Sequence, residues 1–194
     1  MIGGGEEMGN EQGEMGPKPL RSGARRAYNT AMLLDRADPK GFVLKALREA
    51  GNSLISEMYG ADEEMLDVSV ADGELCLKEI AAHMRDTEEL ALKQIAAIAE
   101  GSRLTLPSWD VDLLPLEREY RSQGLEVFLS EFRGLRRETT AFLWTAGDYA
   151  WESVGRHPFR GEISLGQIAS ELAQHDLEHL WQVRRLKHEL GAAD

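Results

Sequence analysis

Residues 164 to 190 read SLGQIASELAQHDLEHLWQVRRLKHEL, and this stretch decides the fold. Its apolar residues recur at intervals of three and four, which places them on one face of a long helix. The positions on that face are Ile168, Leu172, His175, His179, Val183, Leu186 and Leu190. Two histidines therefore stand where the pattern calls for leucine, and the inner face of this helix carries polar nitrogen atoms.

Three earlier stretches show the same helical periodicity. Asp38 and Pro39 supply an N-cap and a first-turn proline for a helix that ends near Gly60. A second helix is predicted after residue 73 and ends at Gly101, and a third begins at Leu125. The sequence therefore predicts an all-α four-helix bundle with up-down-up-down directions and no strands. A long connection over residues 102–124 separates the second and third helices, and residues 147–161 are expected to form a loop.

The first residues differ in composition from the rest of the chain. Residues 1–26 are rich in Gly, Glu, Asn and Gln, with prolines at Pro17 and Pro19. Such a segment buries too little apolar surface to offset its loss of conformational entropy. We therefore expect residues 1–26 to form a disordered tail and residues 27–194 to form the bundle.

Charge and hydropathy argue against nucleic-acid and membrane functions. Lys and Arg number 22 against 34 Asp and Glu, a formal net charge of −12 that repels a polyanion. The arginine pair Arg136 and Arg137 is expected on the solvated side of its helix. No apolar run is long enough to cross a bilayer. The chain start lacks a secretory pattern and Cys76 is the single cysteine, so the cytoplasm is the expected location.

Three histidines predict a metal site. His175 and His179 are four residues apart, so their rings project from one helical face and can bind one ion. His83 lies on the inner edge of the second helix, and in an up-down-up-down bundle the parallel second and fourth helices would bring all three to one depth. The alternative is that each is a hydrogen-bonded core histidine. A metal ion satisfies the three nitrogen atoms together, which favours the metal site.

The type of site follows from its ligands. Three neutral nitrogen ligands leave a coordination position open, which is typical of catalytic sites, and they suit Zn, Ni, Fe or Co without selecting among them. His157, in the loop before the fourth helix, is expected to contact a substrate. Asp176 and Glu178 flank the ligand pair and are expected to face solvent or to support the ligands from behind.

The chain resembles the DinB-like (DinB/YfiT) superfamily of metalloproteins. The matching segments are DGELCLKEIAAH at residues 72–83, GRHPFRGEISL at residues 155–165 and HDLEHL at residues 175–180, within a likeness from about Pro39 to Leu190. The resemblance implies a four-helix bundle with a metal triad of His83, His175 and His179. It also implies thiol-dependent transferase or isomerase chemistry with a low-molecular-weight thiol as cosubstrate. Leu75 and Cys76 stand where Trp-Ser is common in the family, which weakens any transfer of substrate contacts.

These observations lead to one functional hypothesis and one alternative. The hypothesis is a metal-dependent enzyme, a thiol-dependent transferase or a hydrolase, whose small-molecule substrate enters near the loops before the second and fourth helices. The alternative is a non-catalytic bundle that binds a metal or a ligand. A homodimer is compatible with such a bundle, although no residue in the sequence marks an interface.

Overall fold

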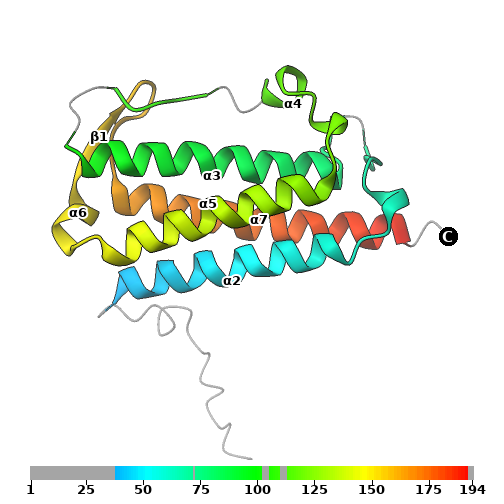
Figure 1. Cartoon of the computed structure of the whole chain (residues 1–194), viewed down its shortest axis with the longest axis horizontal. Coiled ribbons are helices and arrows are strands. Elements are labelled where there is room, and N and C mark those ends of the chain that lie inside the picture. The colour runs from blue at the N-terminus through cyan, green and yellow to red at the C-terminus, as the bar shows by residue number, and fades with distance from the viewer. Residues whose placement is uncertain (1–37, 72, 102–104, 110–112, 192–194) are drawn as a thin grey trace, which may run out of the picture. The chain divides into compact units, whose positions relative to one another are not determined.

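The computed structural model describes residues 38–71, 73–101, 105–109 and 113–191, so the predicted tail over residues 1–26 lies outside the described residues. Four long helices pack side by side: α2 (Pro39–Tyr59), α3 (Leu77–Ala99), α5 (Leu125–Thr145) and α7 (Leu165–Gly191) (Figure 1). The predicted four-helix bundle and its long second connection are confirmed. The shorter helices are η1 (Glu63–Met65), α4 (Leu114–Glu117), η2 (Tyr120–Ser122) and α6 (Asp148–Glu152).

Local chemistry sets where the helices begin. The carboxylate of Asp38 accepts a hydrogen bond from the backbone N–H of Gly41 at 2.7 Å, which caps α2. At the start of α7, Ser164 Oγ accepts from the N–H of Gln167 at 3.1 Å. Gln167 Oε1 accepts in return from the N–H of Ser164 at 2.8 Å, so two otherwise unpaired backbone donors are satisfied.

Ion pairs near the helix ends fix the direction of α7. Glu57 and Arg184, each near the C-terminal end of its helix, pair at 2.8 Å, so α2 and α7 run parallel. Glu74, just before α3, pairs at 2.6 Å with Arg185 near the end of α7, so α3 and α7 run antiparallel. The predicted up-down-up-down order is therefore wrong, because it would make α3 and α7 parallel.

The long connection has a topological cause. Arg85 lies in the first half of α3 and Glu131 in the first half of α5, and they pair at 2.7 Å, so these neighbouring helices are parallel. The consecutive helices α2 and α3 lie diagonally opposite each other in the bundle. Parallel neighbours cannot be joined by a tight turn, so the chain returns along α3 before α5 begins. The described parts of the connection lie beside α3 in Figure 1.

A short hairpin precedes α7, and this corrects the prediction that the bundle has no strands. β1 (Val154–His157) pairs antiparallel with β2 (Gly161–Ser164), with Gly155 opposite Ile163. A Cβ atom on Gly155 would lie 2.7 Å from the side chains of Ile98 and Leu106, so only glycine lets β1 pack this closely against the end of α3. Neither strand, VGRH or GEIS, alternates apolar with polar residues, so the sequence lacks the usual signal of a strand.

The core consists of two apolar layers with polar side chains between them. The layer nearer the start of α3 includes Leu54, Leu77, Ile80, Phe128 and Val183. The layer nearer the end of α3 includes Leu47, Ile95, Ile98, Leu143 and Leu172. Between them lies a central polar layer formed by the buried residues Glu88, Arg136, Thr139 and Asp176. No helix in the described part of the chain is long and apolar enough to cross a membrane.

Arg136 of α5 joins all four helices within the central polar layer. Its Nη1 donates to Asp176 of α7 and to the carbonyl oxygen of Leu47 in α2 at 2.7 Å. Its Nη2 donates to Glu88 of α3 at 2.6 Å and to Asp176 Oδ1 at 2.9 Å. Arg136 is only 6% exposed, so the expectation that it lies on the solvated side is wrong. A Cβ atom on Gly51 would lie 2.9 Å from Nη1, so glycine gives the guanidinium room beside α2.

Two buried carboxylates share this one guanidinium. Glu88 and Asp176 are both fully buried. Burial raises the pKa of Asp176 to about 6, although Arg136 acts to lower it. The expectation that Asp176 faces solvent is therefore wrong, and its contact with Arg136 fixes α7 to α5.

Replacing Arg136 with alanine is expected to lower the free energy of unfolding by about 3–5 kcal/mol, because Glu88 and Asp176 would remain buried without a cation. Arg137→Ala is the matched control, since Arg137 is exposed and its loss is expected to cost less than about 0.5 kcal/mol. Urea denaturation at neutral pH measures both values. Similar small losses in the two variants would contradict this role of Arg136.

Candidate metal centre

The structure brings the three predicted histidines together. His175 Nε2 lies 3.0 Å from His83 Nε2 and 3.1 Å from His179 Nε2. The ligand-type nitrogen atoms of all three lie within 4.8 Å of one another, and each residue is partly buried. His83 comes from α3, whereas His175 and His179 come from successive turns of α7. One ion between these helices could reach all three rings.

The histidines meet for a different reason from the one the sequence suggested. The predicted match in depth assumed that α3 and α7 run parallel, and they run antiparallel. His83 nevertheless lies level with His175 and His179 because Arg185 of α7 is held beside Glu74, just before α3. His83 follows Glu74 by about two and a half turns, and His175 and His179 precede Arg185 by about three and about one and a half turns, so the rings meet at the same level.

The protein environment keeps these histidines neutral. Burial lowers the pKa of His83 to about 4, and the nearby His179 lowers it further in the same direction. Burial, followed by the other two histidines and Arg136, lowers the pKa of His175 to about 3. Burial also lowers the pKa of His179. Neutral imidazoles are the form that binds a metal ion.

Hydrogen bonding alone does not satisfy the cluster. Gln182 Oε1 accepts from His179 Nδ1–H at 2.8 Å, so Nε2 of neutral His179 carries a lone pair. His175 Nε2 has at most one proton but faces two nitrogen atoms, so one of the two short contacts lacks a bridging proton. Among the described residues, no partner reaches the buried His175 Nδ1.

A metal ion fits this arrangement of nitrogen atoms. Ligands at about 2.0–2.1 Å from a tetrahedral zinc ion lie roughly 3.3 Å from one another, close to the two observed separations. The Gln182 contact also orients the His179 ring in the way that metal-binding histidines are commonly supported. The donor set therefore suits one divalent ion, with the metal identity left open by its all-imidazole composition.

A cavity of about 740 Å³ opens beside His175. Its walls come from α3, the connection after α3, the hairpin and α7. No residue of the described loop before α3 lines it, so of the two predicted entry loops only the one before α7 contributes. Its size is that of a small-molecule site.

His157, which is predicted from the sequence to contact a substrate, lines this same cavity. It lies at the end of β1, and its Nδ1 accepts from the backbone N–H of Phe159 at 3.2 Å. Burial and the charge of Arg160 lower the pKa of His157, so at neutral pH its proton is on Nε2. His157 can therefore offer a hydrogen-bond donor.

Two charged residues of the cavity, Arg160 and Glu171, were not predicted from the sequence as site residues. Arg160 follows β1, and Glu171 lies four residues before His175 on α7. The spacing of Glu171, His175 and His179 is a signal that could have identified the carboxylate, because residues four apart share a helical face. Trp109, which also lines the cavity, has no such signal because it lies in the irregular connection.

Residues 44–183 match the family model of the DinB superfamily. The chain belongs to the DinB superfamily. No curated protein matches the chain.

Solved structures share this DinB-superfamily fold at low identity. YfiT from Bacillus subtilis, described as a probable metal-dependent hydrolase with an unusual four-helix bundle topology, has a TM-score of 0.73 and 17% identity over 78% of this chain and 87% of its own. An uncharacterised Escherichia coli protein has a TM-score of 0.61 and 16% identity over 78% of this chain and 94% of its own. A further four-helix bundle protein has a TM-score of 0.54 and 19% identity over 75% and 98%. At these identities the likeness shows the fold.

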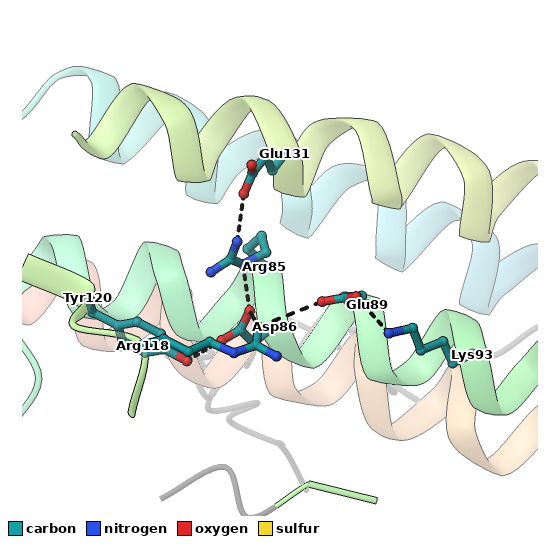
Figure 2. Close-up of polar contacts among 7 residues, drawn as sticks. All are labelled: Arg85, Asp86, Glu89, Lys93, Arg118, Tyr120 and Glu131. Carbon is teal, nitrogen blue, oxygen red and sulfur yellow. Dashed lines mark hydrogen bonds and ion pairs between the residues drawn. The ribbon is translucent and has the colours of Figure 1, made fainter. Parts of the chain in front are cut away.

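In this DinB-superfamily chain, a buried carboxylate holds the long connection against α3. Asp86 is fully buried, and Figure 2 shows Arg85, Arg118 and Tyr120 converging on it. Arg118 Nη1 donates to Asp86 Oδ1 at 2.5 Å, Arg85 Nε lies 2.6 Å from the same oxygen, and the Tyr120 hydroxyl donates to Oδ2. Two of these three side chains come from the connection, so Asp86 anchors it.

The anchor also positions one wall of the cavity. The Trp109 ring lies 4.7 Å from the Arg118 guanidinium and 4.8 Å from Lys93 Nζ, both measured to the ring centroid. Gln94 Nε2 donates to the carbonyl oxygen of Pro107 at 2.8 Å. These contacts hold Trp109 where it lines the cavity beside His175.

Asp86→Asn preserves the side-chain shape but removes the charge that two guanidinium groups share. It is expected to lower the free energy of unfolding by about 2–3 kcal/mol and to speed amide exchange over residues 105–122. Glu49→Gln is the control, because Glu49 pairs with Lys45 at 3.9 Å in an exposed position away from Asp86 and is expected to contribute less than about 1 kcal/mol. Unchanged exchange over residues 105–122 in Asp86→Asn would contradict the anchor.

Proposed function

We propose that this chain is a metal-dependent enzyme in which His83, His175 and His179 hold one divalent ion and the adjacent cavity holds a small-molecule substrate. The observation that carries the proposal is the convergence of three neutral imidazoles, one of which, His175, lines a cavity of about 740 Å³. The alternative, a non-catalytic bundle, would be favoured by apolar side chains sealing the histidines from solvent. His175 instead lines the cavity.

The bound ion would supply Lewis acidity, lowering the pKa of a coordinated water or thiol and polarising a substrate carbonyl. The residues of the chain supply binding and orientation. Leu90, Ile168 and Leu172 give the cavity apolar walls that displace water from an apolar substrate group. The Nε2–H of His157 can donate a hydrogen bond to a substrate oxygen.

A hydrolase is the first candidate within this class. The structural similarity to YfiT, which is described as a probable metal-dependent hydrolase, supports it at the level of the fold. A thiol-dependent transferase is the second candidate, because about 740 Å³ has room for a substrate and a low-molecular-weight thiol together. The two candidates differ in the nucleophile, which is water in the hydrolase and a thiol in the transferase.

Activity assays on the metal-loaded protein test this proposal. Nitrophenyl esters and anilides report hydrolysis, and a chloronitroaromatic electrophile with a small thiol reports transfer. Chelation or His83→Ala is expected to lower kcat/KM by at least about 100-fold, because several kcal/mol of transition-state stabilisation would be lost. His188→Ala, which changes an exposed histidine in the last turn of α7, is the matched control and should leave kcat/KM unchanged.

Two results would contradict the enzyme proposal. One is turnover that is insensitive to both chelation and His83→Ala. The other is the absence of turnover in both substrate classes by protein that carries a full complement of metal, which would favour the non-catalytic bundle.

A further inference from the structure

A charged pair stands beside the cavity. Arg160, in the turn between β1 and β2, donates through Nη1 to Glu171 Oε2 at 2.9 Å, and its Nη2 donates at 2.5 Å to Oε1. The guanidinium is therefore bound by a carboxylate through two parallel hydrogen bonds. About half of each side chain is exposed, at 50% and 49%, so solvent weakens the pair and it can open.

Arg160 is the single lysine or arginine among the described residues that line the cavity, and Glu171 is the single carboxylate. His157 is neutral at neutral pH because burial and Arg160 lower its pKa. The remaining lining is largely apolar and includes Trp109 and Phe159. A ligand in this cavity therefore meets one cationic side chain, and that side chain is now bound to a carboxylate of the protein.

The position of this pair sets a distance to the metal centre. Glu171 precedes His175 by four residues, so its backbone lies about 6 Å back along the axis of α7. A ligand carboxylate that took the place of the Glu171 carboxylate would leave the rest of the ligand beside the helical turn that leads to His175. A ligand chain of about four to five covalent bonds spans this rise of about 6 Å along α7.

The Glu171 side chain has a second position available when Arg160 binds a ligand carboxylate instead. It lines a second cavity of about 750 Å³ as well, whose charged residues are Lys40, Asp38, Asp148 and Glu152. The Glu171 side chain is 49% exposed, so rotation toward this second cavity keeps its carboxylate hydrated. The exchange therefore requires no burial of an unpaired charge.

We propose that Arg160 is the substrate anchor of this cavity: it selects small molecules that carry a carboxylate about one helical turn from the reacting bond, and Glu171 occupies the anchor until the ligand arrives. This proposal rests on the proposed function. It adds a binding site for the end of the substrate that is remote from the metal centre. Arg160 is suited to this task because its planar guanidinium matches a carboxylate in two hydrogen bonds.

Matched probes test the anchor without knowledge of the natural substrate. 4-Phenylbutyrate and its neutral analogue 4-phenylbutanamide are titrated calorimetrically into the metal-loaded protein. The carboxylate is expected to bind at least about threefold more tightly than the amide. Glu171→Gln removes the competing carboxylate and should raise this preference to about tenfold, with amide binding unchanged. Arg160→Gln should abolish the preference.

Arg156→Gln is the matched control, because Arg156 lies in the same hairpin but lines a different cavity, and it should keep the preference. A preference that survives Arg160→Gln, equal binding of the two probes, or no binding of the carboxylate at millimolar concentration would overturn the anchor. The same titration on chelated protein separates the two proposals. A protein that binds no metal but prefers the carboxylate contradicts the proposed function alone, whereas a metal-loaded protein without the preference contradicts the anchor alone.

Discussion

The contacts of Arg136 are the constraint on which the rest of the bundle depends. A bundle of this size would gain more apolar burial from a leucine at this position, yet α5 places a guanidinium at the centre. Through Leu47, Glu88 and Asp176 it fixes the positions of α2, α3 and α7 around α5. Asp176 lies between His175 and Leu177 in α7. Its contact with Arg136 therefore also sets the rotation of α7 about its own axis.

This rotation places His175 and His179 opposite His83. Burial of apolar surface is non-directional, whereas hydrogen bonds between buried charges require defined geometry. The apolar layers on either side exclude water from the charged groups and strengthen their interaction. Stability and the geometry of the candidate metal centre therefore come from the same part of the core. The cavity beside it depends on a separate element, the connection that Asp86 holds against α3.

The sequence predicted local features well and relations between distant segments less well. The helical stripe through Ile168, His175 and Val183 identified both the last helix and its two inward histidines, because periodicity and burial are local properties. Periodicity carries no information about helix direction, so the parallel pairing of α3 with α5 was missed. Arg136 looked like a surface residue because it adjoins Arg137, and its carboxylate partners are 40 and 48 residues away. Arg160 and Trp109 enter the cavity only through the tertiary fold, and no sequence pattern marks them.

The most direct test of the account is the metal content of the protein measured by elemental mass spectrometry. The native chain is compared with a His175→Ala, His179→Ala double variant whose helix content is verified by circular dichroism. The account predicts close to one divalent ion per chain in the native protein and loss of that ion in the folded variant. Absence of metal from the native protein, even after incubation with zinc or nickel, would contradict it and leave the three histidines as polar residues of the core.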